Sequence, residues 1–165
     1  MVTASTPTDP VVPPDVAARQ QWMRTLAEAG SAELIGAWER WEPKPEVRHI
    51  RGPEAGLVMV RGRADAGGVR FNLGEATVTR ATVRLHGAPV GSDVIGSSYV
   101  LGTDLDHAEL AAIFDGMLAD PVVRERVLDE VVTPLERRQR QHDESRQAEA
   151  RSTLVDFFTV AREHE

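Results

Sequence analysis

The chain of 165 residues contains no cysteine and a single lysine, Lys44. Without cysteine there can be no disulfide, no thiolate zinc site, no iron–sulfur ligation and no cysteine nucleophile. One lysine also leaves few candidates for Schiff-base chemistry. The positive charge is therefore carried almost wholly by arginine, whose guanidinium forms bidentate contacts with carboxylates and phosphates that lysine cannot copy.

The sequence also lacks any apolar run near the length of about 18 residues that a membrane-spanning helix requires. Its first residues have neither the basic region nor the apolar region of a secretory signal, so we expect a cytoplasmic protein. Four prolines in residues 1–15 predict a disordered tail. A net charge of −7, from 26 acidic and 19 basic residues, argues against a nucleic-acid binder.

The common catalytic motifs are missing too. The sequence has no Walker-type phosphate loop, no GxGxxG after a strand, no GxSxG elbow and no HExxH. None of the five histidines is followed by another four residues later. We therefore expect no catalytic residue and no metal site in this chain.

What is present in the middle of the chain is the residue pattern of β-strands. The predicted strands are 46–51, 56–63, 69–73, 75–86 and 94–101. The stretch ADAGG at 64–68 predicts a turn, which would join the second and third of these strands as a hairpin. The connections are too short for helical crossovers, so we expect a four- to five-stranded, mostly antiparallel sheet.

Helical spacing of apolar residues appears on both sides of this β region. Helices are predicted over 16–29, from Ser31 onward, from Thr103 and from Asp120. Thr103 precedes Asp106 by three residues, which indicates a capping box, and Pro134 should kink or interrupt the last helix. Residues 16–136 thus predict a single α+β domain, with helices flanking the sheet.

Residues 137–165 differ from this domain and predict a helical arm. Residues 137–152 hold no apolar side chain larger than alanine, yet they are rich in helix formers. An apolar docking segment follows, formed by Leu154, Val155, Phe157, Phe158 and Val160. Such a cluster must be buried, either by folding back onto the protein's own helices or by docking on another chain. The sequence leaves both possibilities open.

The strand 75–86 places Arg80 and Arg84 on one face, about 13 Å apart at the rise of a strand. That distance is too long for one phosphate, but Arg80 could hold an anion together with a residue from another strand. His107, near the start of a predicted helix, is a weaker anion-binding candidate, for which a solvated or capping role is favoured. The strand is thus either an anion site or a polar face covered by solvent or by a partner.

Four stretches of the sequence resemble the PhnG subunit of the bacterial carbon–phosphorus lyase system. They are RQQWMRTLAEAG (Arg19–Gly30), GLVMVRGRADAGGVRFNLGEATVTRATVRL (Gly56–Leu85), SSYVLGTDLDHAELAAIFDGML (Ser97–Leu118) and RSTLVDFFTVAR (Arg151–Arg162). The resemblance covers residues 17–162 or so. The stretches are specific in combination, because none of them is a general-purpose motif.

This resemblance implies a subunit of a core complex that includes PhnH-, PhnI- and PhnJ-like subunits and works with a PhnL-like ATPase-type protein. In organic phosphonate catabolism, the family is tied to transfer of the ribose triphosphate moiety of ATP to an alkylphosphonate such as methylphosphonate, with release of adenine. ATP is then a substrate of the complex. The resemblance assigns this subunit no bound cofactor and no catalytic residue.

We therefore expect a structural subunit without catalytic activity of its own. Its sheet face, with Arg80 and Arg84, and its C-terminal docking segment would be buried against partners. The alternative is a stand-alone enzyme or module that binds phosphate or phosphonate through Arg80, Arg84 and His107.

Overall fold

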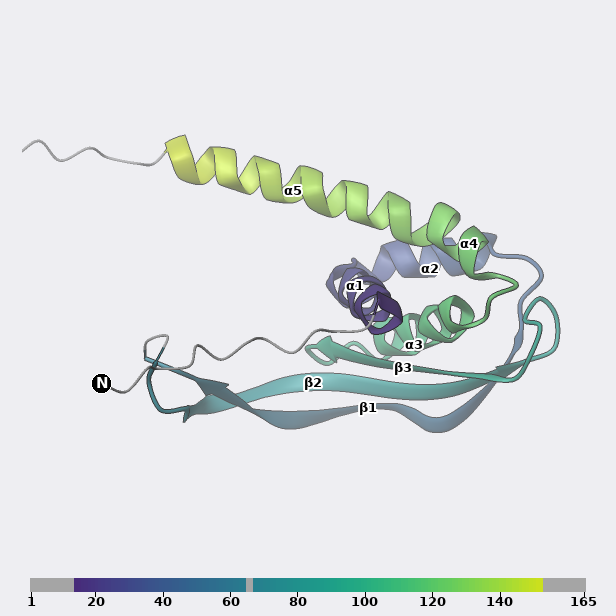
Figure 1. Ribbon diagram of the computed structural model, residues 1–165, viewed down its shortest axis with the longest axis horizontal. Coiled ribbons are helices and arrows are strands. Elements are labelled where there is room, and N and C mark those ends of the chain that lie inside the picture. Colours follow the sequence, from purple (N-terminus) through teal and green to yellow (C-terminus); the bar gives the residue numbers. More distant parts are fainter. Residues whose placement is uncertain (1–13, 65–66, 153–165) are drawn as a thin grey trace, which may run out of the picture.

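The computed structural model describes residues 14–64 and 67–152. Figure 1 shows an α+β arrangement in which the helices lie over one face of a long, twisted sheet. The elements, in order, are α1 (Pro14–Glu28), α2 (Ser31–Arg40), β1 (Glu46–Gly62), β2 (Phe71–His86), β3 (Val94–Leu101), α3 (Leu105–Ala119), α4 (Arg124–Val127), the π-helix η1 (Leu128–Val132) and α5 (Thr133–Ser152). The α+β class predicted from the sequence is confirmed.

The described residues form three strands in the order β1-β2-β3, all antiparallel, so the prediction of four to five strands is wrong. The predicted strands 46–51 and 56–63 are parts of β1, and 69–73 and 75–86 are largely merged in β2. The apparent break at Gly52-Pro53 is absorbed by register shifts between His49 and Glu54. A bulge lets one strand continue past extra residues, and an edge strand such as β1 tolerates proline.

The predicted hairpin is confirmed, because the ends of β1 and β2 pair at Gly62 and Phe71. Beyond the hairpin end, β2 alternates between its two faces. Thr79, Ala81, Val83 and Leu85 are buried beneath the helices, whereas the residues between them face the other side.

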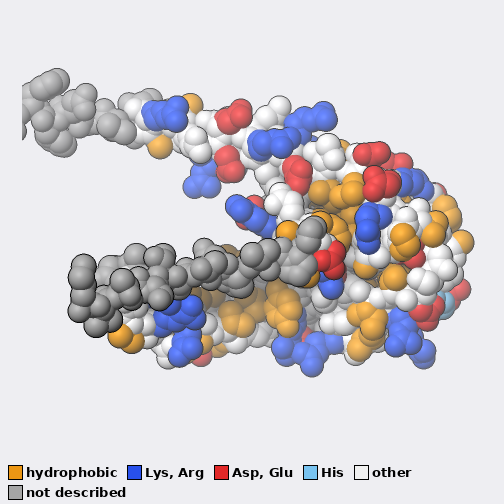
Figure 2. All heavy atoms as spheres, viewed as in Figure 1, with side chains coloured by type: hydrophobic (Ala, Val, Ile, Leu, Met, Phe, Trp, Pro, Cys, Tyr) orange, Lys and Arg blue, Asp and Glu red, His pale blue; other side chains and the backbone are white. Residues whose placement is uncertain are grey.

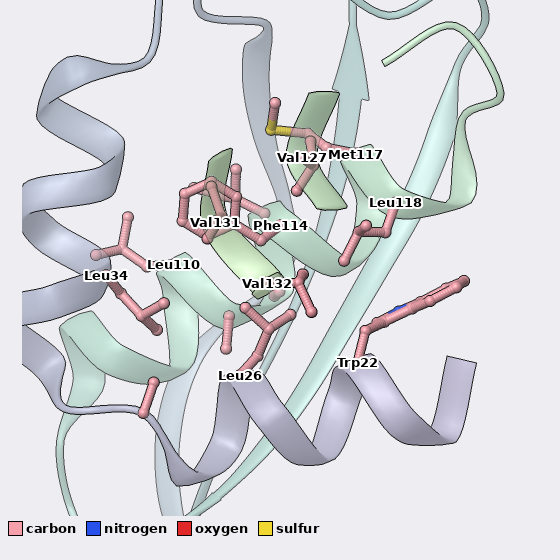
Figure 3. Close-up of a cluster of buried hydrophobic side chains, with 14 of the residues drawn as sticks. Trp22, Leu26, Leu34, Leu110, Phe114, Met117, Leu118, Val127, Val131 and Val132 are labelled. Carbon is pink, nitrogen blue, oxygen red and sulfur yellow. The ribbon is translucent and has the colours of Figure 1, made fainter. Parts of the chain in front are cut away.

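Helix α3 is the centre of the core. It packs on β2 and β3 on one side and on α1, α2 and the end of α4 on the other. The apolar side chains of this helix include Phe114, Met117 and Leu118, which are fully buried (Figure 3). Helix and sheet approach closely where Gly96 of β3 meets Gly116 of α3: a side chain at Gly96 would overlap the carbonyl oxygen of Ala112.

The structure corrects one predicted helix cap and shows the form that a predicted helix interruption takes. The N-cap of α3 is Asp104, not Thr103, and its carboxylate accepts the backbone N–H of His107 at 2.9 Å. The interruption predicted at Pro134 takes the form of η1, in which the N–H of Thr133 donates to Leu128, five residues back. Because proline has no N–H to donate, the helix rearranges its hydrogen bonds just before that residue.

Helix α5 leaves the body of the molecule, as Figure 1 shows. Its first turns are held by an ion pair of 2.6 Å between Arg138 and Glu33 and by a bond of 2.9 Å from Gln139 to the carbonyl of Thr25. From residue 141 to residue 151 every side chain is exposed. The helical character predicted for 137–152 is therefore observed, and this part of the helix has no core of its own.

Candidate interaction surface

The candidate site is the face of the sheet that points away from the helices, which we call the open face. On β2 it carries Arg80, Thr82 and Arg84, which alternate with the buried residues. Among the described elements, the helices that contact β2 and β3 all approach from the opposite side, as Figure 1 shows. A one-sided sheet usually exposes polar side chains to water, so apolar residues on this face require an explanation.

Large apolar side chains do occur on the open face. Strand β3 contributes Ile95, Tyr99 and Leu101, and all three are exposed, with Leu101 at 77%. They lie directly across from Arg84, Arg80 and Val78 of β2. Exposed aliphatic and aromatic groups interleaved with arginine are the composition found in protein–protein interfaces.

Arg80 and Arg84, the two arginines predicted to contact a partner, have different surroundings. Arg80 donates to Glu54 across the β1–β2 pair at 2.8 Å, and this bond raises the pKa of its guanidinium. Arg84 lies directly opposite Arg48, another arginine. Of the carboxylates that the structure describes, none forms an ion pair with Arg48 or Arg84. Arg80 is thus neutralised within the chain, whereas Arg84 and Arg48 form an uncompensated pair of like charges.

His107 lies on the other side of the sheet, and of the two roles favoured for it from the sequence, solvated or capping, the solvated one is wrong. Its side chain is 6% exposed. Nε2 lies 2.8 Å from the carbonyl oxygen of Leu26 in α1. Its backbone N–H donates to Asp104, and this bond lowers the pKa of that carboxylate. The sheet separates His107 from Arg80 and Arg84, so the structure does not bring the three anion-binding candidates together.

Asp115 of α3, which was not among the residues singled out from the sequence, is a fully buried carboxylate. Oδ1 accepts Arg19 Nε at 3.1 Å and Trp22 Nε1 at 2.9 Å. Oδ2 accepts a second Arg19 nitrogen at 2.7 Å and the backbone N–H of Ser97 at 2.9 Å. The contact raises the pKa of Arg19. The sequence does contain one signal for this role of Asp115: it is an aspartate among the apolar residues of a predicted helix.

A second buried carboxylate, Asp120, joins two loops through hydrogen bonds. It accepts the backbone N–H groups of Gly91, Ser92 and Val122 at 2.9–3.2 Å. These donors tie the β2–β3 loop to the turn after α3. With their oxygens occupied by protein donors, Asp115 and Asp120 hold the fold together and offer no free base for catalysis.

Within residues 14–64 and 67–152, no three or more His, Asp or Glu side chains form a group that could hold a metal ion. None of the described helices has the length and apolar character needed to cross a membrane. The docking segment of the sequence analysis, Leu154, Val155, Phe157, Phe158 and Val160, lies outside the described residues. Its partner-binding role therefore stays a prediction.

Comparison with known proteins adds two findings. The family model described as "Phosphonate metabolism protein PhnG" matches residues 17–163. A protein of Rhizobium meliloti (strain 1021), named alpha-D-ribose 1-methylphosphonate 5-triphosphate synthase subunit PhnG, is 46% identical to this chain over 150 residues. The match covers 89% of this chain and 90% of that protein, so it includes the sheet, the helical layer and most of α5.

Proposed function

This chain belongs to the PhnG family of phosphonate metabolism proteins, and from that premise we propose that it is a subunit of an alpha-D-ribose 1-methylphosphonate 5-triphosphate synthase. The observation that carries the proposal is the 46% identity to a subunit of that synthase over nearly the whole of both chains. The reaction proposed for the assembled enzyme moves the ribose triphosphate moiety of ATP onto an alkylphosphonate and releases adenine.

Within that enzyme, the chain supplies binding surface and no reacting group. Two structural features support this role. The buried carboxylates have their oxygens occupied by protein donors, and the candidate anion-binding side chains His107 and Arg80 are on opposite sides of the sheet. The open face, in contrast, exposes apolar groups beside arginine. Subunits of the PhnH, PhnI and PhnJ types are the proposed partners, and the handling of ATP falls to them.

The test is to co-express the chain with those three subunits and the PhnL-like protein from the same genome, and to purify the assembly through a tag on a partner. We expect the chain to co-purify, and adenine to be released from ATP and methylphosphonate only by assemblies that contain it. The isolated chain should release none and should give no binding heat with ATP or methylphosphonate. Adenine release by the isolated chain, or full activity of an assembly that lacks it, would contradict the proposal.

A further inference from the structure

The hairpin formed by β1 and β2 extends well beyond the third strand. Strand β3 ends at Leu101, opposite Val78, whereas β1 and β2 continue to pair as far as Gly62 and Phe71. We call the two-stranded part, residues 57–62 and 71–77, the ribbon. Figure 1 shows it projecting from the body at the far end of the sheet from the β2–β3 loop. An isolated two-stranded hairpin is marginally stable in water, so a ribbon of this length needs cover.

Both faces of the ribbon are apolar and exposed. On the face continuous with the helix-covered side lie Leu57 and Met59, of which Leu57 is 63% exposed. On the face continuous with the open face lie Val58 and Val60, each 40% exposed. Clustered large apolar side chains at the surface mark interaction sites. With both faces apolar, a partner that touched one face would leave the other in water.

The charged residues of β1 and β2 indicate what kind of protein surface covers the ribbon. Residues 46–86 contain seven arginines and four acidic residues, although the chain as a whole has a net charge of −7. Directly opposed like charges destabilise a sheet, yet Arg48 and Arg84 oppose each other on the open face, and no ion pair of the described residues includes either of them. Carboxylates from outside the chain would relieve this repulsion.

We propose that the ribbon is inserted into an apolar groove of another subunit of the synthase, which also places carboxylates against Arg48 and Arg84. This inference rests on the proposed function and specifies the partner's surface. A second copy of this chain is a poorer occupant, because packing two open faces together would bring two sets of arginines into one interface.

The test uses the co-expressed assembly and three exposed positions. Leu57→Glu and Val60→Glu each place a charge on one face of the ribbon, and Val122→Glu, at a site that is 67% exposed on the turn before α4, is the matched control. We expect each ribbon variant to lower the amount of chain recovered with the tagged partner at least about tenfold, because a buried unpaired charge disrupts an interface. The control should co-purify as the wild type does.

Arg84→Glu tests the charge component separately. In the free chain, the new carboxylate would face Arg48 and form a cross-strand ion pair, so the thermal stability of the free chain should not fall. In the assembly, the same carboxylate would face the partner's carboxylates, and we expect about a tenfold loss of co-purification. Unchanged recovery of this variant would overturn the proposed charge complementarity.

Hydrogen exchange provides a readout that does not depend on a substitution. Amides of residues 57–62 and 71–77 should exchange at least about tenfold more slowly in the assembly than in the free chain. If the wild-type chain assembles while the ribbon exchanges as fast as in the free chain, or if only one face variant fails to assemble, insertion is overturned and the proposed function is unaffected. A wild-type chain that joins none of the subunits would overturn both.

Discussion

At the scale of the single residue, Asp115 determines how three elements meet. Its carboxylate receives four donors from α1 and β3 while its own backbone belongs to α3. A buried carboxylate is costly unless hydrogen bonds and an opposite charge replace its hydration. Here Arg19 supplies the charge, and Trp22 and Ser97 supply the remaining N–H groups. The arrangement specifies the angle at which α1 crosses α3.

We expect Asp115→Asn to lower the free energy of unfolding by about 2 kcal/mol, because an amide NH2 then replaces a carboxylate oxygen and faces N–H donors in a buried site. The side chain of Arg19 is 44% exposed, so water partly replaces its lost counter-charge. The measurement is urea denaturation of the dilute chain followed by circular dichroism. Asp143→Asn, at an exposed position on α5, is the control and should change the free energy of unfolding by no more than about 0.5 kcal/mol. Equal stability of the two variants would show that the four donors contribute little.

At the scale of the element, α5 depends on a small set of contacts at its base. The side chains of its outer turns are exposed, so packing against the body adds little to them, while Glu33 and Arg138 help to attach the inner turns to α2. The bond from Arg138 lowers the pKa of Glu33, as does the N–H of Gly30. A carboxylate with a lowered pKa stabilises the folded state above its usual pKa, and this stabilisation is lost as the pH falls through the folded value.

A pH series on Glu33→Gln tests this attachment. At neutral pH the variant should be less stable than the wild type by up to about 1 kcal/mol, since the ion pair is partly exposed. The difference should shrink as the pH falls below the usual value of 4.5 for a glutamate, because the wild-type carboxylate then becomes neutral as well. Thermal unfolding between neutral pH and pH values below that pKa provides the measurement. For Glu144→Gln, an exposed change on α5, the difference from the wild type should not vary in this way.

At the scale of the whole molecule, a well-packed body carries two projections. Figures 1 and 2 show α5 and the β1–β2 hairpin leaving the body in the same general direction. The body has a continuous core, whereas the ribbon and the open face expose apolar side chains. A molecule of this shape has its unsatisfied apolar surface in places that another chain can reach.

We therefore expect the isolated chain to self-associate as its concentration rises, and to remain dispersed when it is co-expressed with its partners. The physical reason is that exposed apolar side chains and unpaired strand edges associate with the same surfaces of other copies when no partner covers them. Light scattering on a dilution series is the measurement. The double variant Leu57→Glu/Val60→Glu should scatter less than the wild type. A wild-type chain that stays monomeric throughout the series would contradict this expectation.

Much of the secondary structure could be predicted from local patterns, because helical and strand periodicities are properties of neighbouring residues. The hairpin turn and the helical arm followed from such signals. The number of strands could not be predicted in this way, because Gly52-Pro53 has the composition of a strand break. The bulges that carry β1 past these residues depend on its pairing with β2. The N-cap was misplaced by one residue for a similar reason, because Thr103 and Asp104 are both good caps.

The amino-acid sequence by itself determined the family, the α+β class and the absence of cysteine chemistry, since these depend on residue identities and their local order. The tertiary structure alone decided that His107 is buried, that Asp115 receives its donors, and that Arg84 faces Arg48 while Arg80 faces Glu54. Those outcomes depend on residues separated by 18–96 positions in the chain. Contacts of that kind arise when distant segments pack together, and no local pattern specifies which atoms then meet.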